Sequence, residues 1–132
     1  MEEGRGKTLG GSTYERLTVY QRSYAAALGV HRATQGLREN RDLVDQLRRA
    51  SRSIPANLAE GVNLSNSEVE TKRFLGMAWR SCDEVRVWLR FCRDLELLPR
   101  TTVEPWEQEY LELGAMLYRL WQRWRHQPPA GR

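Results

Sequence analysis

One stretch of the sequence combines an aromatic side chain with several arginines at helical spacing. Trp79 is followed by Arg86, Arg90 and Arg93, at steps of seven, four and three residues. On a helix this spacing places the four side chains along one side. Aromatic rings stack on bases and guanidinium groups bind phosphates, so the pattern is typical of a surface that grips a nucleic-acid strand. The alternative is a rim against a partner subunit, in which these arginines pair with Asp83, Glu84 or Asp94.

A second group of arginines is Arg48, Arg49 and Arg52, in the segment 48–61. Arginine accounts for 19 of the 21 basic residues, and its planar guanidinium suits bidentate phosphate contacts. The net charge of +4 and the pI of about 9.4 permit a nucleic-acid partner without requiring one. A solvated helix face gives the same pattern. The candidate nucleic-acid-binding residues are these three together with Arg86, Arg90 and Arg93.

Catalytic chemistry has no equivalent signal. An active site needs a nucleophile beside a base, inward-facing paired carboxylates, or Glu-x-x-His pairs of the di-metal bundles. Neither His31 nor His126 has a Glu three positions before it. Cys82 and Cys92 point about 80° apart on one predicted helix, so they cannot bridge internally; small buried apolar residues in a reducing compartment are expected. We therefore expect no enzyme, no cofactor, no metal and no small-molecule substrate.

The length and hydropathy of the chain set its organisation. At 132 residues it can bury one core without disulfides or metals. No apolar run approaches the ~18 residues of a membrane span, and the N-terminus lacks the apolar core of a secretory signal. A cytoplasmic protein without a membrane partner is expected. We predict a flexible leader at 1–12, a four-helix bundle at 13–126 and a flexible tail at 127–132.

The first predicted helix, residues 14–37, carries two apolar seams on nearly opposite sides. One contains Leu17, Tyr20, Tyr24, Ala27 and His31, and the other contains Val19, Ala26, Val30, Ala33 and Leu37. A helix with a single buried face needs only one seam. Two seams predict a helix sandwiched inside the bundle or against a neighbouring subunit, which indicates a homo-oligomer. We assign Val19, Ala26, Val30 and Leu37 to the oligomer interface.

The second predicted helix, residues 43–60, has an apolar face that includes Leu43, Leu47 and Ile54. Pro55 removes one intrahelical hydrogen bond, which predicts a bend near Arg52. Gly61 is expected to end the helix in the left-handed conformation.

The third and fourth predicted helices complete the bundle. The third, residues 68–97, starts with a capping box in either of two registers, Ser65 with Glu68 or Ser67 with Glu70. Glu104 and Pro105 open the fourth, whose apolar seam runs from Trp106 to Trp124. Short connections between four helices predict an all-α, antiparallel up-down-up-down four-helix bundle.

Three segments resemble one known family, the four-helix-bundle proteins encoded in intervening sequences of large-subunit ribosomal RNA genes. Residues 14–21 are similar to the start of the family's first helix. Residues 47–61 are similar to its signature, and residues 74–85 to its third helix. The resemblance spans roughly 14–124 and implies one ungapped bundle.

The same family includes the accessory variability determinant (Avd) of diversity-generating retroelements. Residues 87–98, with their Trp-Leu-Arg run, resemble the Avd form of the third helix. This resemblance implies a barrel-like homopentamer that binds RNA or DNA and a reverse transcriptase, supporting mutagenic copying of a template. The 17 acidic residues make this chain less basic than many such relatives, which lowers the expected affinity.

Two functions therefore remain from the sequence. The first is a non-catalytic accessory protein that binds nucleic acid and a reverse transcriptase. The alternative is a ribosomal RNA intervening-sequence-type protein acting as a structural homo-oligomer or protein-interaction module. Reversing the charges of Arg86, Arg90 and Arg93 should abolish nucleic-acid binding under the first, and should be tolerated under the second.

Overall fold

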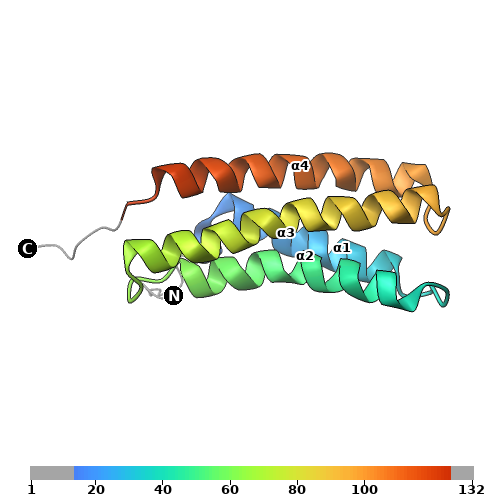
Figure 1. Cartoon of the computed structure of the whole chain (residues 1–132), viewed down its shortest axis with the longest axis horizontal. Coiled ribbons are helices and arrows are strands. Elements are labelled where there is room, and N and C mark those ends of the chain that lie inside the picture. The colour runs from blue at the N-terminus through green and yellow to red at the C-terminus, as the bar shows by residue number, and fades with distance from the viewer. Residues whose placement is uncertain (1–13, 126–132) are drawn as a thin grey trace, which may run out of the picture.

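The computed structural model describes residues 14–125, which form four helices in chain order. They are α1 (Thr18–Ala33), α2 (Arg41–Gly61), α3 (Glu68–Asp94) and α4 (Arg100–Arg123). Successive helices lie side by side, and short connections join them at alternate ends of the molecule (Figure 1). The described residues contain no strand, so the prediction of an all-α four-helix bundle is confirmed. The expected leader 1–12 and tail 127–132 lie outside the described residues.

The core is built from one face of each helix, with α3 packed between α2 and α4. Its largest fully buried side chains are Val30, Leu47, Ile54, Leu58, Leu75, Val85, Leu89, Val103, Tyr110, Leu113 and Leu117. Burying one such aliphatic side chain contributes about 1.5–3 kcal/mol. None of the described helices has the length and apolar character needed to cross a membrane.

The two cysteines lie in this core on α3. Cys82 and Cys92 are fully buried and unpaired, as the sequence predicts. Burial disfavours the thiolate and raises the pKa of Cys82 to about 12 and that of Cys92 to about 11. Both thiols therefore act as small apolar groups in the packing of α3.

The oligomer interface predicted on α1 is wrong, because its residues face the core of their own chain. Val19, Ala26 and Val30 are buried there, and Leu37 is half-buried against the same core. The other seam is divided: Ala27 is buried, Leu17 and Tyr20 pack partly against the core, and Tyr24 is 51% exposed. Two seams of similar apolar content cannot show from sequence which one meets the rest of the bundle.

Helix α1 also ends earlier than predicted, at Ala33. Thr34 follows it at the C-cap and is buried. The Thr34 hydroxyl donates a hydrogen bond of 2.8 Å to the Val30 carbonyl oxygen, which also accepts from the Thr34 backbone N–H at 3.2 Å.

Two residues of α2 are special, and one of them, Gly61, has a role that differs from the one predicted. The helix runs through Pro55 without interruption, and Pro55 is buried. Gly61 is the last residue of the helix and does not adopt a left-handed conformation. A Cβ atom at Gly61 would lie 2.4 Å from the Cβ of Phe74 on α3. Gly61 is therefore required for the close approach of α2 and α3.

The connection between α2 and α3 is held by local hydrogen bonds. Of the two predicted capping boxes, the structure forms the one at Ser67 and Glu70, with N–H to oxygen distances of 3.1 Å in both directions. The hydroxyl of Thr71, which is buried, donates to the Gly61 carbonyl oxygen at 2.8 Å. The start of α3 is thereby tied to the end of α2.

Helix α4 begins at Arg100, before the predicted Glu104 and Pro105. The backbone N–H groups of Thr102 and Val103 donate to the Pro99 carbonyl oxygen at 2.9 and 3.0 Å. The early start turns Val103 into the core, where it is fully buried.

A charged cluster joins α1 to α4 on the surface. Arg22 donates to Glu109 and, at 2.7 Å, to Glu112. The hydrogen bond from Arg22 lowers the pKa of Glu112, and the two carboxylates raise the pKa of Arg22. Because the Glu112 pKa is lowered in the folded chain, this pairing stabilises the fold above the ordinary glutamate pKa and is lost as pH falls through the lowered value.

Replacing Gly61 by Ala should destabilise the protein by about 1–3 kcal/mol, because the added methyl group overlaps the Phe74 side chain. Urea unfolding followed by circular dichroism measures this. Gly36→Ala is the matched control, since a Cβ there meets nothing within 4 Å. The cost of Gly61→Ala should shrink in a Phe74→Gly background, which lacks the Cβ atom that the added methyl group overlaps; an equal cost in both backgrounds would contradict the role assigned to the contact.

Candidate nucleic-acid interface

The predicted stripe on α3 lies along the junction of α3 and α4. Trp79 and Arg86 line one side of a groove of about 320 Å³, and Leu111 and Tyr118 of α4 line the other. The residues of the stripe reach this junction because the buried residues of α3 turn the helix so that positions 79, 86 and 93 face α4. The structure thus brings Trp79 and Arg86 together, as the spacing predicts.

Three aromatic rings contact one another at this junction. The ring centroids of Trp79 and Tyr118 are 4.9 Å apart, and those of Tyr118 and Trp121 are 6.2 Å apart with nearly parallel planes. The Lys72 ammonium lies 5.0 Å from the centre of the Trp121 ring, in a cation–π contact. Tyr118 is 39% exposed, so the cluster reaches the surface.

We call this surface the aromatic–basic face. It comprises Lys72, Trp79, Arg86, Arg90, Tyr118 and Trp121. Arg90 is exposed and forms no ion pair with any residue that the structure describes. Arg86 is paired only loosely, with 3.7 Å between its Nη1 and the Asp83 Oδ1. The face thus offers rings for stacking beside three cations, two of which, Arg86 and Arg90, lie one turn apart on α3.

Arg93 does not belong to this face. Its Nη1 lies 3.2 Å from Glu107 of α4 and its Nε lies 3.0 Å from Asp94, so two carboxylates hold its guanidinium. Both Arg93 and Glu107 are about one-fifth exposed at the side chain. The hydrogen bond to Asp94 raises the pKa of Arg93. Arg93 therefore links α3 to α4 and is not available for phosphate, which corrects the sequence-based assignment.

The three arginines predicted on α2 point to different parts of the molecule. Arg48 donates from Nε to the Thr34 hydroxyl at 2.8 Å, and so fixes the end of α1 against α2. Arg49 lines a groove between α2 and α3, together with Arg80. Arg52 lines a groove between α1 and α2. These arginines consequently do not form one phosphate-binding surface.

The sequence alone does not identify Tyr118, Trp121 and Lys72 as residues of the site. Trp121 was assigned to the core seam of the fourth helix, and it does pack partly against the core. The available signal was Tyr118, whose position beside that seam places it at the edge facing α3. Only the relative rotation of α3 and α4 shows that these residues meet Trp79.

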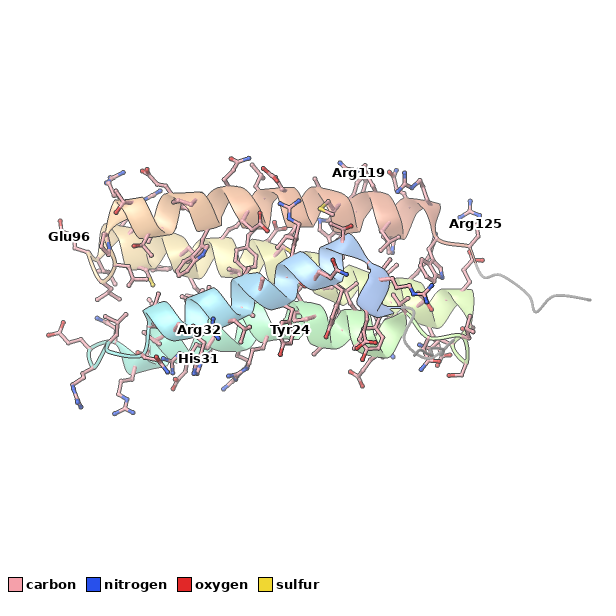
Figure 2. The ribbon with its side chains drawn as sticks, turned by 180° about the vertical axis from the view of Figure 1, so that it is seen from behind. Tyr24, His31, Arg32, Glu96, Arg119 and Arg125 are labelled. Carbon is pink, nitrogen blue, oxygen red and sulfur yellow. The ribbon has the colours of Figure 1, made fainter. Side chains whose placement is uncertain are left out.

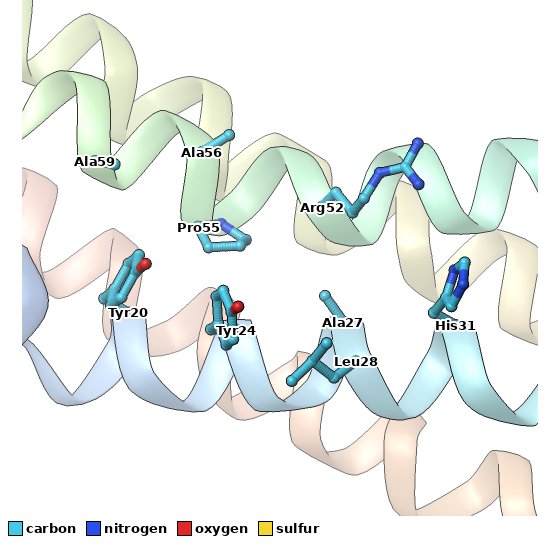
Figure 3. Close-up of a pocket in the computed structure, with 9 residues that line it drawn as sticks. All are labelled: Tyr20, Tyr24, Ala27, Leu28, His31, Arg52, Pro55, Ala56 and Ala59. Carbon is cyan, nitrogen blue, oxygen red and sulfur yellow. The ribbon is translucent and has the colours of Figure 1, made fainter.

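A second, apolar groove lies on another side of the molecule, between α1 and α2. It has a volume of about 480 Å³. In Figure 3, Tyr20 and Tyr24 of α1 point towards Pro55 of α2, while His31 and Arg52 lie at the other end. Small residues of α2, Ala56 and Ala59, form part of the opposite wall.

Tyr24, His31 and Arg32 are exposed side chains of α1 (Figure 2). A third exposed apolar surface is a ridge on α3 formed by Val87, Phe91 and Leu95, which are 47%, 47% and 51% exposed. We call it the α3 ridge.

In the described part of the chain, no three His, Cys, Asp or Glu side chains lie close enough together to bind a metal ion.

Comparison with known proteins identifies the family of the chain. The model of the family described as 23S rRNA-intervening sequence protein matches residues 15–119. The chain belongs to this family. The match contains α1, α2 and α3 completely and α4 as far as Arg119, so it includes every residue of the aromatic–basic face except Trp121. No curated protein sequence matches this chain.

The reassignment of Arg93 predicts different effects for two neighbouring arginines. Arg93→Ala should lower the thermal midpoint, because the half-buried carboxylate of Glu107 loses its partner. Arg90→Ala should leave the midpoint unchanged, since Arg90 has no ion pair among the described residues. Differential scanning calorimetry of the two variants measures this, and equal midpoints would contradict the structural role of Arg93.

Proposed function

We propose that this protein is a non-catalytic accessory protein that binds RNA or DNA through the aromatic–basic face. The observation that carries the proposal is the meeting of three contacting rings with Lys72, Arg86 and Arg90 on one outer side of α3 and α4. Base–aromatic stacking tolerates any sequence, and a row of cations follows the phosphate backbone. The combination suits a single-stranded segment better than a regular duplex, whose bases are not available for stacking on protein rings.

The protein partner that we propose is a reverse transcriptase. In this proposal the protein acts as an Avd-like accessory factor of a diversity-generating retroelement and supports template-directed mutagenic cDNA synthesis. The support is the resemblance of residues 87–98 to the Avd form of the third helix.

Charge reversal tests the nucleic-acid part of the proposal. The triple variant Lys72→Glu, Arg86→Glu, Arg90→Glu should lose the electrophoretic mobility shift that the unaltered protein gives with a structured RNA or a single-stranded DNA at moderate salt. The reason is that three phosphate contacts become repulsive.

A matched control keeps the same net charge. The triple variant Arg32→Glu, Arg38→Glu, Arg41→Glu changes three exposed arginines near the connection of α1 and α2, none of which belongs to the aromatic–basic face. It should retain the shift. Equal losses in the two triple variants would mean that binding follows total charge and not this face, and no binding at low salt by the unaltered protein would overturn the proposed function.

A second candidate function is a structural homo-oligomer or protein-interaction module, as in the ribosomal RNA intervening-sequence type. The observation in its favour is the apolar groove between α1 and α2, which leaves Tyr24 and Leu28 exposed. Such a surface on a small domain is typical of a contact with another protein. We propose that the antiparallel bundles assemble as a homopentameric ring, which is compatible with either function.

The occupant that we propose for the groove is the α3 ridge of a second copy. The ridge is apolar, with the exposed carboxylates of Glu84 and Asp94 near it on α3, whereas Arg52 and His31 line the groove. Groove and ridge are different surfaces, so the contact is heterologous and generates a ring when the rotation closes.

Substitutions in the two surfaces test this assembly. Tyr24→Glu and Phe91→Glu should each reduce the mass measured by multi-angle light scattering to that of one protomer, because a charge enters an apolar contact. Val69→Glu is the control, since Val69 is 77% exposed and lies outside both surfaces. A ring that persists in both test variants would exclude the groove–ridge contact, and an unaltered protein that stays monomeric at high concentration would exclude the ring.

A further inference from the structure

One buried hydroxyl lies beside the groove between α3 and α4 without a hydrogen-bond partner. Tyr110 of α4 is fully buried and lines this groove. Its hydroxyl is the one buried side-chain polar atom in the described part of the chain that has no partner. Buried polar groups are nearly always paired, so an unpaired one points to a partner that binds from outside.

The walls of the groove are aromatic and small. Trp79 of α3 and Tyr118 of α4 both line it with their ring centroids 4.9 Å apart, and Gly114 and Ala115 of α4 are the small residues of its wall. A Cβ at Gly114 would lie 3.6 Å from the Cβ of Cys82, so this part of the wall is close to the core of α3. The volume of about 320 Å³ is within the range of small-ligand pockets.

The rim of the groove presents one acceptor and one donor side by side. The Asp83 carboxylate is 69% exposed and the Arg86 guanidinium 34% exposed, and the 3.7 Å between them leaves both with free hydrogen-bonding capacity. A carboxylate accepts from neighbouring N–H groups, and a guanidinium donates to a carbonyl oxygen or a ring nitrogen. Guanine presents N–H donors next to its O6 acceptor, and this order matches the Asp83–Arg86 pair.

We propose that this groove binds one unstacked base of a single-stranded nucleic acid, with guanine as the best match. The base stacks on Trp79 or Tyr118, its polar edge meets Asp83 and Arg86, and its entry exposes the Tyr110 hydroxyl, which is fully buried in the free chain and so gains its missing partner. Proteins read unstacked bases by this combination of stacking and hydrogen bonds to the base edge. The inference rests on the proposed nucleic-acid function and adds the base that the aromatic–basic face selects.

Burial raises the pKa of Tyr110, so its hydroxyl keeps its proton and can either donate or accept.

The experiment compares a base with its absence. The probes are guanosine 5′-monophosphate and ribose 5-phosphate, titrated into the full chain at constant ionic strength and followed by ¹H–¹⁵N NMR. Guanosine monophosphate should give saturable shifts at the Trp79 indole and the Gly114 amide, and ribose phosphate should not. Adenosine, cytidine and uridine monophosphates should bind several-fold more weakly. Equal responses to guanosine monophosphate and ribose phosphate, or no saturable response at millimolar concentration, would overturn the proposal.

Two variants locate the effect. Tyr110→Phe should weaken guanosine monophosphate binding several-fold and leave the thermal midpoint unchanged or higher, because the hydroxyl has no partner within the chain. A strongly lowered midpoint would show an internal partner and remove the premise. Gly114→Leu fills the groove and should abolish nucleotide binding while circular dichroism confirms the fold; retained binding would place the base elsewhere.

The two proposals fail separately. If the unaltered protein shifts RNA but does not distinguish guanosine monophosphate from ribose phosphate, the nucleic-acid function stands and the base site falls. If it binds guanosine monophosphate at the groove but shifts no RNA or DNA, the base site stands as a nucleotide pocket and the proposed function falls.

Discussion

The rotation of α3 about its own axis is the constraint on which the other features depend. It is set by fully buried residues on one side of the helix, Leu75, Ala78, Cys82, Val85, Leu89 and Cys92. With these in the core, Trp79 and Arg86 must face α4, while Val87 and Phe91 must face solvent. Gly61 allows α2 to approach α3 closely at Phe74, and the Arg93–Glu107 pair holds α4 on the other side. The positions of the aromatic–basic face and of the α3 ridge thus both follow from the packing of α3.

The sequence predicts the helices well because their periodic patterns are long and their ends carry local signals. The seam of α4 is confirmed, with Tyr110, Leu113 and Leu117 fully buried, and so is one of the two predicted capping boxes. The orientation of α1 was not predictable, since both of its seams are apolar and only contact with α2 and α4 distinguishes them. The sequence predicts Gly61 as a helix terminator because a glycine that ends a helix and a glycine that permits close packing cannot be distinguished by residue type alone.

The candidate site was partly predictable from helical spacing. Spacing along one helix places Trp79 and Arg86 together, since both lie on α3. It cannot show that Arg93 meets Glu107 or that Tyr118 meets Trp79, because those contacts depend on how two helices are rotated and aligned. The family match shows that the chain belongs to the 23S rRNA-intervening sequence protein family. The nucleic-acid and reverse-transcriptase roles are proposals that rest on surface chemistry and resemblance. The apolar groove between α1 and α2 and the aromatic–basic face between α3 and α4 use different helix pairs, so assembly and nucleic-acid binding do not compete for the same residues.

The central claim is that the aromatic–basic face binds single-stranded nucleic acid through three cations. The most direct test is the salt dependence of binding of the unaltered protein to a single-stranded oligonucleotide, measured by fluorescence anisotropy. Three phosphate contacts predict a slope of about −2 for the logarithm of the association constant against the logarithm of salt concentration, from roughly 0.7 per phosphate. The same measurement on Lys72→Glu, Arg86→Glu, Arg90→Glu should show no binding from which a slope could be obtained. A slope near zero for the unaltered protein would contradict the account.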